Sequence, residues 1–216
     1  MQFHWLNKQN NDKLIIFFTG WSFDEKPFEF LECGDFDVII FYDYNNLELN
    51  KIPHYKEYFL IAWSMGVFTA YLLKDILPDF SKKIAINGTP HPVDENFGIP
   101  EKPFLLTLRH AAKGLEGKFY QNIFDTQQEY ERYLNTPVKR TIDNRVSELN
   151  SIYEKIKNTE ITYKPYYNKA IISSNDKIIP TQNQINFWQD NADTKLIESG
   201  HFPYYNFKSW NEILCR

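Results

Sequence analysis

Six short segments of the chain carry continuous or nearly continuous apolar residues, and each has the length of a β-strand. Continuous rather than alternating hydrophobicity is typical of strands covered on both faces, as in a parallel sheet. Because stretches with helical character separate several of these segments, we predict an α/β fold with a mostly parallel central sheet. The predicted strands span residues 14–19, 37–42, 57–63, 83–87, 169–173 and 194–198.

One long segment, 107–160, contains no strand-like run. Its apolar side chains recur at helical spacing, as in Val146, Leu149, Ile152, Tyr153 and Ile156. We therefore predict a helical lid inserted between the fourth and fifth strands. A length of 216 residues suits one compact domain, so we expect residues 1–216 to form a single domain that includes this lid.

Composition and charge exclude several classes of protein. Hydrophobic residues make up 43% of the chain and charged residues 24%, which indicates a globular protein rather than a disordered one. The formal net charge of −4 argues against nucleic-acid binding by the chain as a whole. No apolar run approaches the roughly 18 residues of a membrane span, and residues 1–13 lack the apolar core of a signal peptide.

The two cysteines, Cys33 and Cys215, lie near opposite ends of the chain. Their positions suggest neither a disulfide framework nor a CxxC metal site. A reducing cytoplasm is the compartment that this cysteine usage fits.

The segment Leu60-Ile-Ala-Trp-Ser-Met-Gly-Val67 has the features of a nucleophile elbow. In the G-x-S-x-G elbow a strand turns sharply into a helix, and small residues on either side let the serine hydroxyl stand clear of the sheet. Ala62 and Gly66 occupy those two positions around Ser64. The alternative is a plain strand-to-helix turn in which the serine only caps the helix.

A serine nucleophile needs a base and an acid that orients the base. In α/β-hydrolases these follow the serine in the order acid, then histidine. Only His201, directly after the last predicted strand, follows both Ser64 and a candidate acid; the other histidines are His4, His54, His91 and His110. The preferred acid is Asp176, at the carboxyl end of the preceding strand, and Asp190 and Asp193 are the weaker alternatives.

The tetrahedral oxyanion of such a reaction needs preorganised N–H donors. We expect one donor to be the backbone N–H of Met65, directly after the serine. The other is expected from the loop after the first predicted strand, where Trp21 follows Gly20. A packing role for the Trp21 side chain is compatible with this assignment.

Several of these motifs together resemble the BioG-type pimeloyl-[acyl-carrier protein] methyl ester esterases, a branch of the α/β-hydrolase superfamily in biotin synthesis. The resemblance covers most of the chain, and one departure is Gly20-Trp-Ser22, where the family commonly has Gly-Trp-Gly. The segments that carry it are Phe18-Thr-Gly-Trp21, Phe41-Tyr-Asp-Tyr44, Ala62-Trp-Ser-Met-Gly-Val67, Ile86-Asn-Gly-Thr89, Asp94 with Gly98-Ile-Pro100, Ser173-Ser-Asn-Asp176 and Gly200-His-Phe202.

The resemblance implies hydrolysis of the methyl ester of a pimeloyl chain carried on acyl-carrier protein, with no metal and no organic cofactor. It makes Trp21, Phe119 and Phe124 the expected substrate-binding aromatics. Without the resemblance, the residues predict a serine hydrolase with a helical lid. They do not indicate whether its substrate is an ester or a thioester. An acyl thioesterase, a general carboxylesterase and a non-catalytic hydrolase-fold binding module remain the alternatives.

An acidic carrier protein would require local positive charge on this acidic chain. We expect the docking surface on the helical insertion, first of all at Lys139 and Arg140. Acidic residues such as Glu116, Glu129, Glu131 and Glu148 are interspersed, so an ordinary solvated helical face is the alternative. The other basic candidates are Arg109, Lys113, Lys118, Arg132, Arg145, Lys155 and Lys157.

Overall fold

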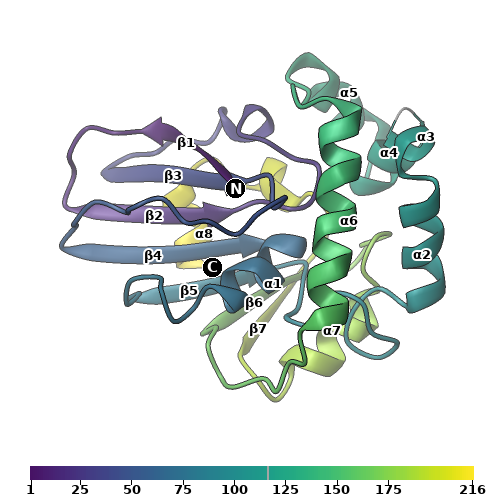
Figure 1. Cartoon of the computed structure of the whole chain (residues 1–216). Helices are drawn as coiled ribbons and strands as arrows, with labels where there is room; N and C mark the ends of the chain where they lie inside the picture. The colour runs from purple at the N-terminus through teal and green to yellow at the C-terminus, as the bar shows by residue number, and fades with distance from the viewer. Residues whose placement is uncertain (116) are drawn as a thin grey trace.

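The computed structural model describes residues 1–115 and 117–216, so Glu116 lies outside the described residues. Its centre is a seven-stranded sheet with the strand order β1-β3-β2-β4-β5-β6-β7. All neighbours run parallel except β1, which pairs antiparallel with β3 at one edge (Figure 1). The strands are β1 (Gln2–Asn7), β2 (Lys13–Phe18), β3 (Phe36–Tyr42), β4 (Glu57–Trp63), β5 (Lys82–Ile86), β6 (Lys169–Ser173) and β7 (Asp193–Ile197).

The six predicted strands are confirmed to within one residue at each end, and the central ones are buried on both faces. In β2, Phe17 contacts Trp210 of α8 (Trp210–Cys215), with ring centroids 5.0 Å apart. Helix α1 (Met65–Leu72) lies in front of the sheet in Figure 1 and α8 behind it. The predicted α/β class with a mostly parallel sheet is therefore confirmed.

Strand β1 was not among the predicted strands. It is an edge strand with only one neighbour, and Gln2, Phe3 and His4 are exposed, so its sequence lacks the continuous hydrophobicity of the central strands. Helix α7 (Thr181–Trp188), which packs on β6 and β7, is a further element without a matching prediction.

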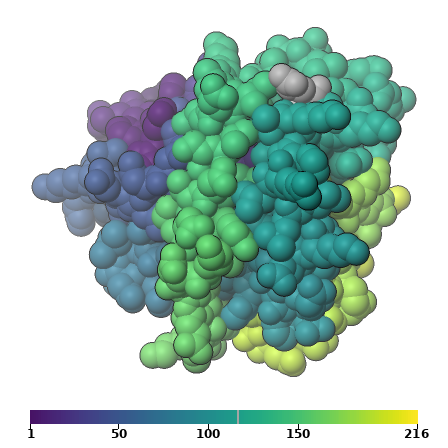
Figure 2. Space-filling view, turned by 45° about the vertical axis from the view of Figure 1, so that its right-hand side comes forward, coloured from purple at the N-terminus to yellow at the C-terminus, as the bar shows by residue number. Residues whose placement is uncertain are grey.

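The segment between β5 and β6 is helical, as expected, but its helices begin at Glu101 rather than at residue 107. The last of them, α6, crosses the carboxyl ends of the strands, and Figure 2 shows it beside the shorter helices of the insertion. No helix within residues 1–115 and 117–216 has the length and apolar character needed to cross a membrane. The helices of the insertion are α2 (Glu101–Arg109), α3 (Ala111–Leu115), α4 (Phe119–Ile123), α5 (Gln127–Asn135) and α6 (Ile142–Asn158).

Candidate active site

Ser64 occupies the turn between β4 and α1. Its backbone has φ 55° and ψ −124°, a conformation that a serine adopts only when the surrounding structure imposes it. Gly66 makes the turn possible, since a Cβ atom there would lie 2.4 Å from the backbone oxygens of Phe18 and Thr19. Gly88 is similarly restricted, because its Cβ would lie 2.5 Å from the Ser64 carbonyl oxygen. The geometry is that of a nucleophile elbow.

His201 connects Ser64 to Asp176. Its Nε2 lies 2.9 Å from Ser64 Oγ, and its Nδ1 lies 2.8 Å from Asp176 Oδ2. The histidine is 3% exposed and the Asp176 side chain is fully buried, so these hydrogen bonds are shielded from water. The three side chains that the sequence analysis selected thus meet at the carboxyl edge of the sheet, each on the loop that follows its strand.

The Asp176 carboxylate is held by four donors. Oδ1 accepts the backbone N–H groups of Ile178 and Ile179, at 2.8 and 3.0 Å. Besides the interaction with His201, Oδ2 accepts the side-chain amide of Gln184 at 2.9 Å. These hydrogen bonds fix the carboxylate toward the imidazole ring.

The alternative acids lie elsewhere. Asp193 is the first residue of β7, so it lies at the amino ends of the strands, away from the carboxyl ends that carry Ser64. Its carboxylate pairs with Lys169 Nζ at 2.9 Å. The hydrogen bond and charge of Lys169 lower the pKa of Asp193. Asp190 is exposed just before that strand. Neither side chain contacts His201.

Asn87 ties the His201 loop to the sheet. Its side-chain Nδ2 donates to the carbonyl oxygen of His201 at 3.0 Å and to Ser173 Oγ at 2.8 Å, and its Oδ1 accepts the Ser173 N–H. Trp63 Nε1 donates to the same His201 carbonyl at 2.8 Å. The Asn-Gly-Thr motif noted in the sequence therefore supports the histidine loop and is more than a turn at the end of a strand.

Trp21 and Met65 flank Ser64 in the cavity wall. Met65 is the first residue of α1, where backbone N–H groups have no partner within the helix. The Trp21 side chain is fixed by a 2.7 Å hydrogen bond from Nε1 to the Arg145 carbonyl oxygen of α6. Both backbone segments are thus held beside the serine, which fits the expected oxyanion donors.

Ser22, the residue noted above as a departure from Gly-Trp-Gly, adopts a positive φ of 72°. This is a conformation that glycine tolerates best. The Ser22 hydroxyl lies 3.0 Å from the Tyr120 hydroxyl, and the Ser22 N–H donates to Glu148 Oε2 at 3.1 Å. Two residues of the insertion therefore fix the strained serine in place.

Glu148 is the centre of a buried charge cluster. Its carboxylate also accepts the Tyr44 N–H at 2.9 Å and pairs with Arg140 Nη1 at 2.8 Å, and Arg140 Nη2 lies 3.4 Å from Asp43. Burial raises the pKa of Glu148, while the Arg140 charge opposes that rise. The guanidinium of Arg140 is buried, so the expectation that Arg140 docks a carrier protein is wrong.

A cavity of about 190 Å³ opens over Ser64 and His201. It is smaller than the roughly 300–1,000 Å³ typical of drug-sized ligands and suits a slender chain. Its wall is largely apolar and includes Trp21 and Phe119, as expected from the sequence. Phe124, the other expected aromatic, does not line it: the ring is 1% exposed and packs on Phe202, with centroids 5.3 Å apart.

A second, more open hollow adjoins this cavity between α2, α3 and α4, and we call it the entrance groove. It has a volume of about 340 Å³ and shares Trp21, Thr107, Phe119 and Asn122 with the cavity wall. Lys118 and His110 also line it. The groove therefore lies directly beside the cavity, against the same four side chains.

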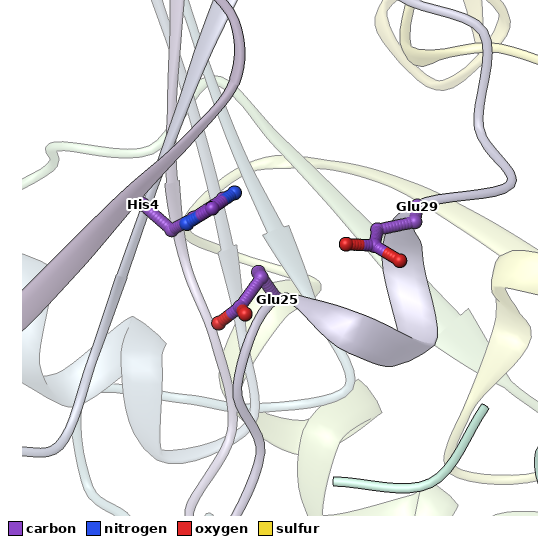
Figure 3. A group of neighbouring side chains, drawn as sticks. All are labelled: His4, Glu25 and Glu29. Carbon is purple, nitrogen blue, oxygen red and sulfur yellow. The ribbon is translucent and has the colours of Figure 1, made fainter. Parts of the chain in front are cut away.

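Among residues 1–115 and 117–216, one group of side chains could hold a metal ion by its spacing, and it lies apart from Ser64. His4 of β1, Glu25 and Glu29 bring their ligand atoms within 4.8 Å of one another (Figure 3). The Glu29 carboxylate is already paired with Lys26 Nζ at 2.5 Å. The competing ammonium group makes this arrangement a poor cation site.

A family model and several solved structures are similar to this chain. A family model described as "Pimeloyl-ACP methyl esterase BioG" matches residues 1–213. The crystal structure of BioG from Haemophilus influenzae is similar with a TM-score of 0.90 and 30% identity, covering 98% of this chain and 99% of that one. An esterase from Exiguobacterium antarcticum, at 13% identity and a TM-score of 0.64 over 94% and 89% of the two chains, shares the α/β-hydrolase fold.

A curated relative is longer than this chain. The protein named malonyl-[acyl-carrier protein] O-methyltransferase of Bacteroides fragilis (strain 638R) is 34% identical over 182 residues. The match covers 81% of this chain but 36% of the relative, so the chain spans little more than a third of that protein. Because the family model covers nearly every residue and the H. influenzae structure matches along the whole chain, this protein belongs to the pimeloyl-ACP methyl esterase BioG family.

Proposed function

We propose that this chain hydrolyses the methyl ester of a pimeloyl chain carried on acyl-carrier protein, with Ser64 as nucleophile, His201 as base and Asp176 as the orienting acid. The observation that carries the proposal is the unbroken chain of contacts from Ser64 Oγ through His201 to Asp176, at 2.9 and 2.8 Å. Family membership supplies the substrate.

The first half of the reaction forms an acyl-enzyme. His201 Nε2 takes the Ser64 proton while Oγ attacks the ester carbonyl carbon. The N–H groups of Met65 and Trp21 stabilise the negative charge that develops on the carbonyl oxygen. The bond to the methoxy group then breaks, and the imidazolium returns its proton to the leaving methanol.

The second half releases the free carboxylate. His201 removes a proton from a water molecule, which attacks the acyl-enzyme, and the proton then passes to Ser64 Oγ as the acyl bond breaks. Asp176 holds the Nδ1–H tautomer of the imidazole and stabilises its charged form throughout. Protein groups and water suffice for both steps.

The insertion serves in this proposal as a lid over the substrate within one domain of residues 1–216. The apolar cavity receives the acyl chain, and the entrance groove takes the flexible arm that links the acyl chain to its carrier. Lys118 lines that groove. In the sequence, residues 101–123 contain Lys102, Arg109, Lys113 and Lys118 against Glu101 and Glu116. This local excess of positive charge on a chain of net charge −4 favours an acidic carrier.

A test separates the proposal from its alternatives. Native protein and Ser64→Ala are each given a carrier-bound pimeloyl methyl ester, a free methyl ester and an acyl thioester of the same chain length. We expect carrier-bound ester to be the preferred substrate, and Ser64→Ala to lose roughly 10⁴- to 10⁶-fold in kcat while remaining folded. Preference for the thioester would favour a thioesterase, and the absence of a fluorophosphonate adduct on native Ser64 would favour a binding module.

A further inference from the structure

The contacts of Gln184 exceed what packing of helix α7 requires. Its side chain is fully buried, and its Nε2 donates to Asp176 Oδ2 at 2.9 Å and to the Ile179 carbonyl oxygen at 3.0 Å. Both neighbours at that end of the amide are acceptors, which identifies it as the nitrogen end. The Gln184 Oε1 at the other end has no hydrogen-bond partner among the described residues. The side chain therefore buries a polar oxygen at a cost in order to direct its N–H groups at Asp176.

The acceptor of this hydrogen bond is the oxygen atom that faces His201. Asp176 Oδ2 receives Gln184 Nε2 on one side and interacts with His201 Nδ1, 2.8 Å away, on the other. The second oxygen, Oδ1, is already held by two backbone N–H groups of the same loop. Gln184 is thus the one side chain besides the histidine that contacts the carboxylate among the described residues, and it does so from a separate secondary-structure element.

We infer that Gln184 is a positioning residue that holds Asp176 in line with His201 and sets how strongly the carboxylate attracts the imidazole proton. The inference rests on the triad of the proposed function. A donor on Oδ2 withdraws negative charge from that oxygen, so it weakens the pull of the carboxylate on the Nδ1–H group. Removing the donor therefore leaves a stronger anion beside the ring and strengthens the attraction between Asp176 and the protonated imidazole.

The chemical groups around His201 are the same in the native protein and in the variants at position 184. Its ring faces Ser64, Asp176 and the indole of Trp63, whose centroid is 5.3 Å away, and Lys177 also lines the cavity. None of these groups is changed by a substitution at position 184. A shift in the titration of the ring would consequently report the Gln184 hydrogen bond.

The test uses Gln184→Met, which keeps the length of the side chain and removes the donor. The matched control is Gln182→Met on the same helix, since Gln182 is exposed and its amide contacts Asn186 instead. The measurement is the second-order rate of Ser64 labelling by a fluorophosphonate between pH 5 and 9. This rate depends on the neutral imidazole and requires no carrier-bound substrate.

We expect the native protein and Gln182→Met to share one pH profile. In Gln184→Met the acid limb should move to higher pH by about one unit, and the plateau rate should fall about tenfold because the carboxylate is less well aligned. A folded Gln184→Met protein with an unshifted acid limb, or with one moved to lower pH, would overturn the inference. Failure of native protein to label would instead refute the proposed function itself.

Two further measurements keep the inference open to refutation if Gln184→Met does not fold. Gln184→Asn retains an amide but withdraws it by one methylene group from Asp176, so it should show the same direction of shift. In native protein, the side-chain amide resonances of Gln184 should respond to the protonation of His201. Gln184 resonances that stay constant through that titration would show that no such coupling exists.

Discussion

The carboxylate of Glu148, in the middle of helix α6, accepts the backbone N–H of Ser22 in the loop after β2, at a distance of 3.1 Å. The same carboxylate accepts the N–H of Tyr44 after β3 at 2.9 Å. The insertion is therefore bound to the loops that follow β2 and β3, the first of which lies beside Ser64, and α6 forms part of the frame of the site. We expect substrate to enter beside α2–α4, at the entrance groove, rather than by displacement of α6.

Glu148→Gln tests this frame. The substitution keeps the side-chain shape but leaves the buried Arg140 guanidinium without its nearest anion, so the free energy of unfolding should fall by about 3 kcal/mol. Fluorophosphonate labelling of Ser64 should also slow, because the Trp21–Ser22 segment loses its anchor. Urea unfolding and labelling kinetics provide the measurements.

The matched control for this prediction lies on the same helix. Glu154→Gln removes an exposed carboxylate that pairs with Lys157 at 2.9 Å, and it should leave both quantities nearly unchanged. Equal effects of the two substitutions would show that the buried cluster has no special role.

Asp176→Asn should lower kcat by roughly 10⁴ because asparagine favours the wrong tautomer of His201. Asp193→Asn, which only breaks a surface pair with Lys169, should leave kcat close to the native value. Steady-state kinetics on a small methyl ester measure both. A small loss of kcat in Asp176→Asn together with a large loss in Asp193→Asn would show that Asp176 is not the acid.

Much of this site could be predicted because its parts depend on local sequence. Ser64, Asp176 and His201 each follow a strand of buried apolar residues, and parallel strands bring their carboxyl ends to one edge of the sheet. The order of the three residues along the chain then selected one histidine out of five. Strand β1 could not be predicted in this way, because an exposed edge strand does not show continuous hydrophobicity.

The supporting residues could not be found in the same way. Glu148 and Arg140 resemble the solvated charges of an amphipathic helix, and only the tertiary fold buries them together. Gln184 lies in a helix that the apolar pattern did not reveal. Phe124 is expected in the pocket from the family resemblance, whereas the direction of its side chain, toward Phe202, depends on helix packing. Buried polar partners and side-chain directions are properties of the folded chain.

Stability should depend on pH through His91. Burial beside Phe97 and Phe187 lowers the pKa of His91 below its ordinary value of 6.5. The unfolded chain therefore binds a proton at a higher pH than the folded chain, so the free energy of unfolding should decrease as pH falls below about 6.5. Urea unfolding at pH 7.5 and 5.5 measures this decrease. We expect the free energy of unfolding to decrease less between the two pH values in His91→Gln than in the native protein. An identical pH dependence in the variant would contradict the assignment to His91.

The last prediction concerns the face around the entrance groove. Among residues 1–115 and 117–216 no carboxylate pairs with Lys113 or Lys118, in contrast to Arg140, which is buried in its cluster. If an acidic carrier docks here, Lys113→Glu with Lys118→Glu should lower kcat/KM for carrier-bound ester about tenfold at low salt and less at high salt. Hydrolysis of a small free ester should change little, because Ser64, His201 and Asp176 are untouched.

The control for this charge reversal makes the same change in net charge elsewhere. Lys51→Glu with Lys164→Glu reverses two exposed lysines outside the insertion, and we expect native kcat/KM for both substrates at either salt concentration. Equal losses in the two double variants would mean that net charge, rather than this face, governs the encounter with the carrier. Equal losses on carrier-bound and free ester in the Lys113/Lys118 variant would mean that these lysines support the fold of α3 and α4, because a docking surface acts only on the substrate that docks.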